Sequence, residues 1–413
     1  MLDGVFAHTG ADSRYFNRFR HYPGCGAYNS HSSVYARWYS FAHYPDDYKC
    51  WWDFKDLPAV NAANPDWRKY MITGERSIVK TWLRDGASGW RLDVADELPD
   101  DVLRGMRSAA KETDPDSVLL GEVWEDAVTK VSYGERRQYA LGDALDSVMN
   151  YPLRDGLVTF LTGRSTARAL ADLLLSQRLN YPRPLYYALM NLTASHDVAR
   201  TRSALALDFD PRSRTRAELA ALEITDAMAA RGAQLQVLAA AVQFWLPGIP
   251  SIYYGDETGM QGLCDPFNRA PLQMCDTQML QWYAKLSALR HAHPALQRGE
   301  VAVFAPAGDV LCVLRVIADS RDAFGEEAED EALLLIVNRA AHPVRCHVEL
   351  TCPGAGLCEE TRLAFVRSEY DCAADCTDDT HIAIRDGVGA FDLPPHAAKI
   401  YRLENRHGTE TGS

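Results

Sequence analysis

Over roughly the first 295 residues, short apolar runs typical of β-strands alternate with amphipathic stretches typical of helices. This rhythm predicts a parallel sheet, because parallel strands need a long crossover connection, which is usually a helix. Asp93 and Glu122 follow two such runs and lie 29 residues apart, about one strand–helix–strand unit. Polar clusters at the carboxyl ends of the strands favour a barrel of eight units over an open sheet. The strand candidates are Leu2–Phe6, Gly89–Val94, Ser117–Trp124, Ala144–Met149, Tyr187–Leu192 and Ile249–Gly255.

Residues 9–56 break this rhythm. The segment is rich in Tyr, His and Trp and has little periodicity, so we interpret it as a long excursion between a strand and the next helix. Loops of this length are uncommon unless they are functional. Between the later strands, the sequence predicts a helix over Val102–Thr113 and another that ends at Gly86, with one face formed by Ile78, Val79, Trp82 and Leu83.

From about residue 295 the pattern changes to short β runs. We expect a catalytic barrel over residues 1–294, a small all-β sandwich domain over 295–405 and a tail over 406–413. The acidic stretch Ala318–Glu331 is expected to be a solvated, disordered loop. The β runs are Val301–Phe304, Val310–Val316, Leu333–Val337, Cys346–Leu350 and Ala398–Arg402.

Charge and composition exclude several classes of partner. The formal net charge of −13 disfavours nucleic acid, whose phosphates an acidic surface repels. No apolar run approaches the ~20 residues that span a bilayer, and the first residues do not resemble a signal peptide. The ten cysteines contain no CxxC pair, so we expect reduced thiols and a cytoplasmic protein rather than a zinc site or a disulfide framework.

Two strand ends carry candidate catalytic carboxylates. In Gly89–Asp93, alternation places Arg91 and Asp93 on one face of the strand, where a cation would hold a carboxylate ionised. A buried ion pair of purely structural role is an equally good interpretation of this motif alone. In Leu119–Trp124, Glu122 lies among apolar residues beside an indole, which would favour a protonated general acid, although an exposed strand-end glutamate is the simpler reading.

Two further motifs contain histidines. His196 and Asp197 would hydrogen-bond sugar hydroxyls, but a surface His–Asp pair is common by chance. His8, which follows the first strand, could contact a sugar; a packed core histidine is the better guess in isolation.

Six segments, in this order and spacing, resemble the signature segments of the α-amylase superfamily, glycoside hydrolase family 13. Val94–Glu97 and the loop Asp265–Arg269 further resemble the neopullulanase, cyclomaltodextrinase and maltogenic amylase group. In that group the loop that corresponds to Asp265–Arg269 grips the non-reducing sugar. Trp51 and Trp52 would offer ring faces for glucose stacking, unless they pack in the core. The six segments are Asp3–His8, Leu57–Asn61, Gly89–Asp93, Gly121–Trp124, Ser195–Asp197 and Gly248–Glu257.

The resemblance implies retaining hydrolysis of α-1,4-glucosidic bonds in maltooligosaccharides, cyclodextrins or pullulan. Asp93 would be the nucleophile and Glu122 the acid/base, with their carboxyl groups about 5–5.5 Å apart, and Asp197 the third carboxylate. The substrate-binding residues would be His8, Arg91, His196, Trp52, Asp265 and Arg269.

The sequence departs from the family pattern in three places. Ala7 replaces an asparagine that often supports a calcium site in the family. We therefore expect no metal or cofactor in this chain, although a longer parent protein could bind calcium. Asp96 replaces another asparagine and adds charge near the acceptor sugar. The first segment begins at Met1 and corresponds to the third barrel strand, so the resemblance implies a (β/α)8 TIM barrel lacking its first two strands.

Alternatives of other kinds stay open. An inactive, truncated sugar-binding remnant is one, and a transglycosylase or isomerase of the superfamily is another. A non-catalytic relative, such as the heavy subunit of amino-acid transporters, should have a transmembrane helix and typically lacks the carboxylates. The expected partner is an α-glucan oligosaccharide, with neither nucleic acid nor membrane, and a homodimer is possible for a longer parent.

Overall fold

The structure is a computed structural model that describes residues 1–350, 363–365 and 388–405. The chain divides into two compact units, Met1–Met149 and Asn150–Ser413. Across the described ranges, no helix combines the length and apolar character needed to cross a membrane. The predicted tail, residues 406–413, lies outside the described residues, and the domain boundary at 294/295 stays a prediction.

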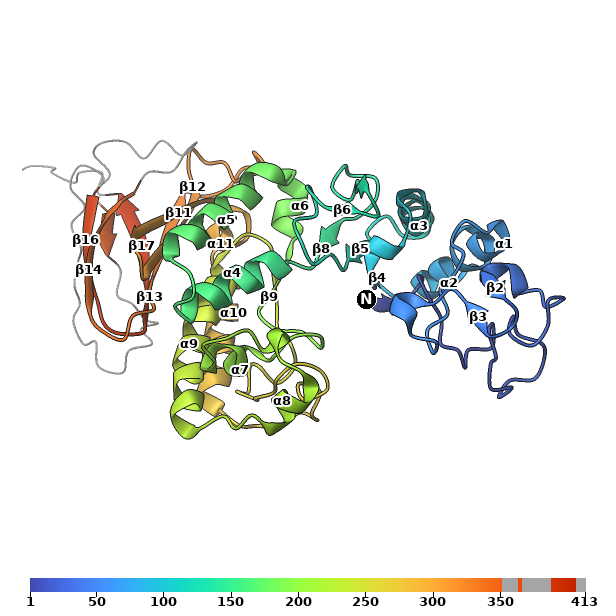
Figure 1. The fold of residues 1–413 in the computed structure, drawn as a ribbon. Coiled ribbons are helices and arrows are strands. Elements are labelled where there is room, and N and C mark those ends of the chain that lie inside the picture. The colour runs from blue at the N-terminus through green and yellow to red at the C-terminus, as the bar shows by residue number, and fades with distance from the viewer. Residues whose placement is uncertain (351–362, 366–387, 406–413) are drawn as a thin grey trace, which may run out of the picture. The chain divides into compact units, whose positions relative to one another are not determined.

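The first unit is built on a parallel four-stranded sheet (Figure 1). Its strands are β1 (Leu2–Gly4), β4 (Gly89–Leu92), β5 (Val118–Gly121) and β8 (Ser147–Val148), in the spatial order β1-β4-β5-β8. Each lies inside a predicted run, which confirms the runs, but every strand is shorter than predicted because its end turns into a loop. Gly89 has φ +150°, and a Cβ there would lie 2.1 Å from the Val118 carbonyl oxygen, so the close approach of β4 to β5 requires glycine.

Two of the helices in this unit follow the predicted pattern. Helix α2 (Ile78–Arg84) begins where the Ser77 side chain accepts a hydrogen bond from the Lys80 backbone N–H, and it buries Val79 and Leu83. Trp82, which was predicted to share a face with Val79 and Leu83, is 49% exposed while those two are buried. Helix α3 (Asp100–Thr113) buries an apolar face that includes Met106. The chain between the excursion and α2 forms α1 (Pro65–Arg68) and a π-helical turn (Lys69–Thr73).

The excursion folds around its own aromatic cluster. Phe16 is fully buried, and the rings of Tyr39 and Tyr48 meet it edge-on at 4.9 and 4.7 Å between centroids. This packing lets a segment without periodicity hold a fixed shape. Its short elements are η1 (Ala36–Trp38), β2 (Phe41–His43), β3 (Asp47–Tyr48) and η2 (Trp51–Asp53). The first unit also contains η4 (Ala95–Glu97), which follows β4, and a hairpin of β6 (Val131–Ser132) and β7 (Glu135–Arg136), which follows β5.

The second unit starts with helices and two more parallel strands. Strand β9 (Met190–Leu192) pairs with β10 (Ile249–Ser251). The strand predicted from Tyr187 is therefore too long, because Pro184 starts a helical turn that includes Tyr187. The helices and 3-10 turn of this part are α4 (Tyr151–Leu161), α5 (Ala167–Asn180), α6 (Arg183–Ala188), α7 (Thr201–Ala206), η5 (Pro211–Ser213), α8 (Arg216–Ala221), α9 (Asp226–Trp245), α10 (Thr277–Ala292) and α11 (Pro294–Arg298).

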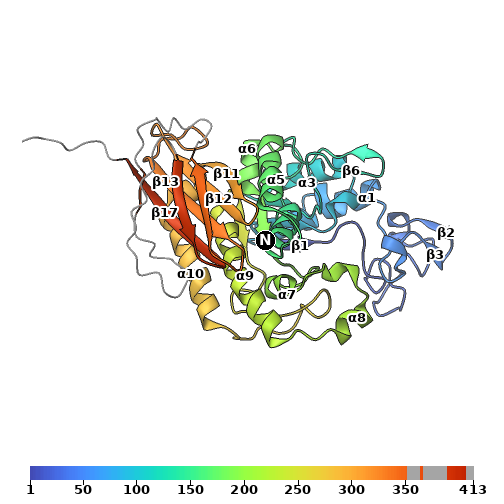
Figure 2. The ribbon, with the colours of Figure 1, turned by 60° about the vertical axis from the view of Figure 1, so that its left-hand side comes forward.

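All five β runs predicted after residue 295 overlap observed strands. An antiparallel sheet has the order β11-β12-β13-β17-β15, and β14 pairs with β16. The two share an apolar core that includes Leu314, Ile336 and Phe391. Figure 2 shows β11, β12, β13 and β17 side by side with α9 and α10 near them. The strands are β11 (Glu300–Ala307), β12 (Val310–Ile317), β13 (Glu331–Asn338), β14 (Val344–Glu349), β15 (Leu363–Phe365), β16 (Val388–Leu393) and β17 (Ala397–Asn405).

The acidic stretch between β12 and β13 has a defined conformation, which corrects the expectation of a solvated, disordered loop. Asp322 is buried, with 6% exposed, and its Oδ1 accepts hydrogen bonds from the backbone N–H groups of Phe324 and Glu326. Its other oxygen lies 3.2 Å from a guanidinium nitrogen of Arg298. The high acidic content misled because one of the carboxylates organises the loop from within.

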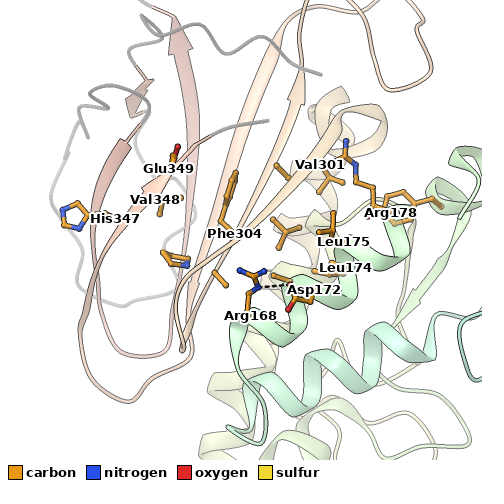
Figure 3. A pocket seen from close by; sticks show the side chains of 16 residues that line it. Arg168, Asp172, Leu174, Leu175, Arg178, Val301, Phe304, His347, Val348 and Glu349 are labelled. Carbon is orange, nitrogen blue, oxygen red and sulfur yellow. Dashed lines mark hydrogen bonds and ion pairs between the residues drawn. The ribbon is translucent and has the colours of Figure 1, made fainter. Parts of the chain in front are cut away.

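A groove of about 420 Å³ lies between α5 and strands β11 and β14 (Figure 3). Its floor is apolar, with Leu174, Val301 and Phe304, and Arg168 pairs with Asp172 at its rim at 2.8 Å. Its lining includes none of the sequence-predicted site residues, so this groove does not locate the chemistry.

Candidate active site

The predicted nucleophile lies at the carboxyl end of β4 and shares a cation with two other carboxylates. Arg91 Nη1 donates hydrogen bonds to Asp93 Oδ1 and to Asp3 Oδ1, both at 2.7 Å. Asp3 is opposite Arg91 in the register of β1 and β4. The prediction from alternation, that Arg91 and Asp93 share one face of the strand, is therefore confirmed. The Asp93 side chain is 21% exposed, so it is open to a ligand while it is held.

Glu122 directly follows β5 and is buried, with 4% exposed. Its Oε2 accepts a hydrogen bond from the Val94 backbone N–H at 2.8 Å. The same oxygen lies 2.9 Å from Arg91 Nη2 and forms an ion pair with it, without a hydrogen bond. Its Oε1 accepts from Trp124 Nε1 at 3.1 Å. The simpler interpretation of the motif, an exposed strand-end glutamate, is therefore wrong, and the surroundings of Glu122 are more polar than its apolar neighbours in the sequence indicated.

Burial by itself would lower the pKa of the Arg91 guanidinium, but the carboxylates of Glu122, Asp3 and Asp93 outweigh it and raise that pKa above its usual value. Arg91 therefore stays charged in the buried site. The coupling is mutual, because a cation stabilised by anions stabilises those anions in return.

Val94 carries the backbone strain of the site. Its φ of +37° lies in the left-handed region, which a β-branched residue rarely adopts. Such strain, on the order of 1–3 kcal/mol, persists only where the surroundings enforce it. Here it turns the chain directly after Asp93 and aims the Val94 N–H at Glu122 Oε2. The strained residue thus links the loop after Asp93 to Glu122.

His8 is half-buried, and its ring stacks on Trp51 with centroids 5.6 Å apart. Burial lowers the pKa of His8, while the charges of Asp93 and Glu97 oppose that shift. The ring therefore lies within electrostatic reach of Asp93, and its contact with a sugar stays a prediction. Trp52 stacks on Trp51 at 5.3 Å and is 74% exposed, so core packing does not explain its position.

The charge that Asp96 adds is compensated within the first unit. Its Oδ2 lies 2.9 Å from Lys130 Nζ, and its Oδ1 accepts a hydrogen bond from Tyr139 OH at 2.5 Å. Asp96 is thus held in an ion pair, which the sequence could not indicate because Lys130 comes 34 residues later, in a loop without periodicity.

The second unit holds the third predicted carboxylate after β9. Asp197 Oδ2 lies 3.2 Å from His196 Nε2 and 3.5 Å from the hydroxyl of Tyr151, which donates to it. The Asp197 backbone N–H donates to Ser195 Oγ at 3.1 Å. The side chain of Asp197 is 27% exposed and that of His196 is 42% exposed, so both present polar atoms to a ligand.

The loop Asp265–Arg269 packs against the same segment. Arg269 Nε lies 2.7 Å from Asp265 Oδ1, and its Nη2 lies 3.8 Å from Asp197 Oδ1. Asn268 is fully buried, and its Nδ2 lies within hydrogen-bond distance of three backbone carbonyls, those of Ser195 (3.0 Å), His196 (2.9 Å) and Val198 (2.8 Å). Asn268 therefore shapes the turn that carries Asp197.

The residues near His8 offer few free side-chain oxygens to a calcium ion. Ala7 has no side-chain oxygen, Asn61 Oδ1 accepts from the Ala63 backbone N–H at 3.3 Å, and Asp12 Oδ2 contacts His21 Nδ1 at 2.9 Å. A calcium ion needs six to eight oxygen ligands. In the portion of the chain that is described, no group of three or more His, Cys, Asp or Glu side chains is arranged to hold a metal.

The predicted site residues fall into two groups, each coherent within its own unit. Asp93, Glu122, Arg91, His8 and Trp52 belong to the first. The second unit holds Asp197, His196, Asp265 and Arg269. Sequence reasoning missed Asp3, Val94, Tyr151 and Asn268. Strand alternation and pairing could have found Asp3, but no local signal marks the others.

Comparison with known proteins gives one family match. The sequence matches the alpha amylase catalytic-domain family over residues 1–279. An amylopullulanase of Thermoanaerobacterium thermosulfurigenes is 33% identical over 383 residues, which is 85% of this chain and 20% of the relative. A cyclomaltodextrinase of Geobacillus thermopakistaniensis is 29% identical over 352 residues, 82% of this chain and 51% of the relative. The chain thus spans between a fifth and about half of the length of these relatives.

Among solved structures, the cyclic α-maltosyl-(1→6)-maltose hydrolase of Arthrobacter globiformis, in complex with that cyclic sugar, superposes with a TM-score of 0.71. It is 23% identical and is matched over 98% of this chain and 74% of its own. At that identity the likeness concerns the fold.

Proposed function

Because the chain belongs to the α-amylase catalytic-domain family, we propose that it is a retaining glycoside hydrolase that cleaves α-1,4-glucosidic bonds in maltooligosaccharides, cyclodextrins or pullulan. The family membership confirms the resemblance drawn from the six sequence segments. Relatives named cyclomaltodextrinase and neopullulanase support this choice of substrates.

The proposed reaction has two displacement steps. Asp93 attacks the anomeric carbon as Glu122 protonates the leaving oxygen, which gives a covalent glycosyl–enzyme. Glu122, now ionised, takes a proton from water, and that water releases the sugar with its α configuration retained. Asp197 and His196 bind sugar hydroxyls, Trp52 offers its exposed ring, and Asp265 and Arg269 grip the non-reducing end.

One observation carries the proposal: a single guanidinium contacts both reacting carboxylates at the ends of neighbouring strands. Arg91 lies 2.7 Å from Asp93 and 2.9 Å from Glu122, and Glu122 is almost entirely buried. A structural ion pair needs one carboxylate. Two carboxylates on one cation suit a covalent mechanism in which one is the nucleophile and the other the proton donor. Asp93, the proposed nucleophile, is 21% exposed and can therefore be reached by a substrate.

The test measures hydrolysis of maltotriose and β-cyclodextrin by residues 1–413 and two variants. Asp93→Asn should lower turnover on the order of 10⁴–10⁶-fold, because no other group forms the covalent intermediate. Glu122→Gln should lower turnover of maltotriose strongly but form the glycosyl–enzyme from α-maltosyl fluoride, whose leaving group needs no proton. Proton NMR of the first product should show the α anomer.

Matched control variants are available nearby. Glu125→Gln and Asp101→Asn change carboxylates whose side chains are 61% and 59% exposed, and both should keep wild-type activity. Near-normal turnover by Asp93→Asn, or a β anomer as first product, would contradict the proposal. Wild-type protein that binds maltotriose without cleaving it would support the sugar-binding remnant instead.

Transfer to a second sugar is the alternative activity of the same site. It differs only in whether water or a sugar hydroxyl attacks the intermediate, so chromatography of products at rising maltose concentration separates the two.

We propose that no calcium ion or other cofactor takes part beside His8. The proposed partner is the glucan itself, and a homodimer stays a proposal that measurement of the molar mass in solution tests.

A further inference from the structure

The turn η4 contacts both the main chain and the side chain of Glu122. The Val94 N–H donates to Glu122 Oε2 at 2.8 Å, and the next N–H, that of Ala95, donates to the Glu122 carbonyl at 3.2 Å. Ala95 is fully buried, and a Cβ on Gly121 would lie 3.5 Å from the Ala95 Cβ, so the turn packs directly on β5. Any shift of η4 would therefore change the contacts of Glu122.

The backbone that enters this turn is strained, so the turn needs contacts that hold it. Val94 has a φ of +37°, a conformation that lasts only where the surroundings enforce it. The Glu97 N–H donates to the Val94 carbonyl at 2.9 Å, but this contact lies within the turn and does not fix the turn on the rest of the unit. The contacts that do so come from a later part of the chain.

Asp96 is the residue of η4 that these later residues hold. Its Oδ1 accepts a hydrogen bond from the hydroxyl of Tyr139 at 2.5 Å, and its Oδ2 lies 2.9 Å from Lys130 Nζ. The buried Arg137 donates to the Asp96 carbonyl at 2.7 Å and to Asp100 Oδ1 at 2.8 Å. Tyr139 is fully buried, and the side chain of Lys130 is 13% exposed. Both the side chain and the main chain of Asp96 are thus fixed.

The two side-chain partners of Asp96 keep their protons at neutral pH. Burial and the hydrogen bond to Asp96 raise the pKa of Tyr139 well above its usual value. Burial alone would lower the pKa of Lys130, but the carboxylates of Glu125 and Asp96 outweigh it and raise that pKa. Near neutral pH, a titration observed at Glu122 is therefore not that of Tyr139 or Lys130.

We propose that Asp96, Tyr139 and Lys130 are positioning residues that direct the Val94 N–H to Glu122 and so fix the place of the acid/base. This inference rests on the proposed function for the role of Glu122. It also explains the aspartate at position 96, which departs from the family pattern. An asparagine there could accept from Tyr139, but it would leave the charge of the nearly buried Lys130 to Glu125 alone.

The Trp124 indole reports on Glu122 without any need for turnover. Its Nε1 donates to Glu122 Oε1 at 3.1 Å, so its N–H signal in NMR of protein with isotope-labelled tryptophan should follow the ionisation of Glu122. Trp124→Phe assigns this signal among the nine tryptophans. The charged groups that face Glu122 are Arg91, 2.9 Å away, and Asp93 on the same guanidinium, and both stay in place. Tyr139→Phe changes no charge, yet the midpoint should move to higher pH, because a carboxylate that loses an N–H donor keeps its proton longer.

Kinetics test the proton-transfer step itself. In Tyr139→Phe, kcat/KM for maltotriose should fall about tenfold, because a displaced donor loses part of the roughly 10²–10⁴-fold that general acid catalysis contributes. The leaving group of α-maltosyl fluoride needs no proton, so kcat/KM for the fluoride should equal that of wild type. Lys130→Met should behave like Tyr139→Phe, and Lys130→Arg, which keeps the charge, should stay close to wild type.

Tyr28→Phe is the matched control. The Tyr28 hydroxyl donates to Asp46 Oδ1 at 2.5 Å, so this variant removes the same kind of hydrogen bond elsewhere in the first unit and should change neither readout. A wild-type midpoint in Tyr139→Phe would overturn the proposal, even if the melting temperature falls, because the contacts would then only stabilise the fold. A moved midpoint in a protein that hydrolyses neither substrate would support the positioning of Glu122 and contradict the proposed function.

Discussion

Replacing Arg91 tests whether one cation sets the protonation of the candidate site. Arg91→Met keeps the length of the side chain and removes the charge that lies 2.7 Å from Asp93 and 2.9 Å from Glu122. At an effective dielectric constant near 20, each contact of this kind is worth about 4 kcal/mol before desolvation is subtracted. Asp3 contributes least to the net cost, because its side chain is 59% exposed and well screened, while those of Asp93 and Glu122 are 21% and 5% exposed.

Two measured quantities should change. The unfolding free energy at pH 7 should fall by about 3–5 kcal/mol, the cost of leaving a buried carboxylate without its cation. Arg91 favours the ionised carboxylates, so without it they keep their protons to higher pH. The acid limb of the kcat/KM profile should therefore move to higher pH, as expected when a neighbouring arginine is lost. The limb reports the pair, not either residue alone.

Arg91→Lys distinguishes charge from geometry. Lysine restores a point charge but lacks the planar fork that reaches two carboxylates at once. It should return the acid limb most of the way towards wild type while kcat stays low. Arg104→Met, which removes an exposed partner of Asp143, is the matched control and should change neither quantity. An acid limb in Arg91→Met that coincides with that of wild type would refute the reasoning.

Three further predictions concern other parts of the chain. Asn268→Ala should lower kcat about 100-fold by releasing the turn that carries Asp197; wild-type kcat would show that the turn holds itself. Burial raises the pKa of Asp256 to about 6, so above about pH 4 the folded protein keeps a proton that the unfolded chain has lost. The free energy of unfolding is therefore highest at low pH and falls as the pH rises through about 6. Asp256→Asn should therefore gain about 3 kcal/mol of unfolding free energy over wild type between pH 4 and 7, and parallel pH curves would contradict this. Thiol titration of denatured, unreduced protein should find all ten cysteines; six are free thiols in the structure, four lie outside the described residues, and a lower count would contradict a reduced protein.

The sequence predicts those parts of the site that strand periodicity encodes. Alternation along β4 sets Arg91 and Asp93 on one face and buries Trp90 and Leu92 on the other, with 4% and 0% exposed. Apolar runs likewise locate all six strand candidates, since burial is what those runs record. The strands were predicted too long, because an apolar run does not show where the backbone stops pairing with the neighbouring strand.

Side chains in loops were beyond this kind of prediction. Asn268 meets carbonyls 70–73 residues earlier in the chain, and no periodic pattern connects the two segments. Tyr187 has high β propensity, yet the proline at the start of α6 places it in a helix. For Asn268 the deciding contacts are made over a chain distance that local propensity does not sense, whereas for Tyr187 a nearby proline outweighs the β propensity.

The shared cation also bears on how the two proposed half-reactions fit together. Before attack, the proposed mechanism has a negative charge on Asp93 and a proton on Glu122. After attack, Asp93 is a neutral ester and Glu122 carries the charge, so one unit of negative charge has moved from one carboxylate to the other. Arg91, with one nitrogen at each position, faces that charge before and after the step without moving. A cation paired with Asp93 alone would stabilise the starting state and oppose the transfer, whereas this arrangement favours neither end. The hydrogen bonds from the Val94 and Trp124 N–H groups to Glu122 then stabilise the ionised form that must accept a proton from water in the second step.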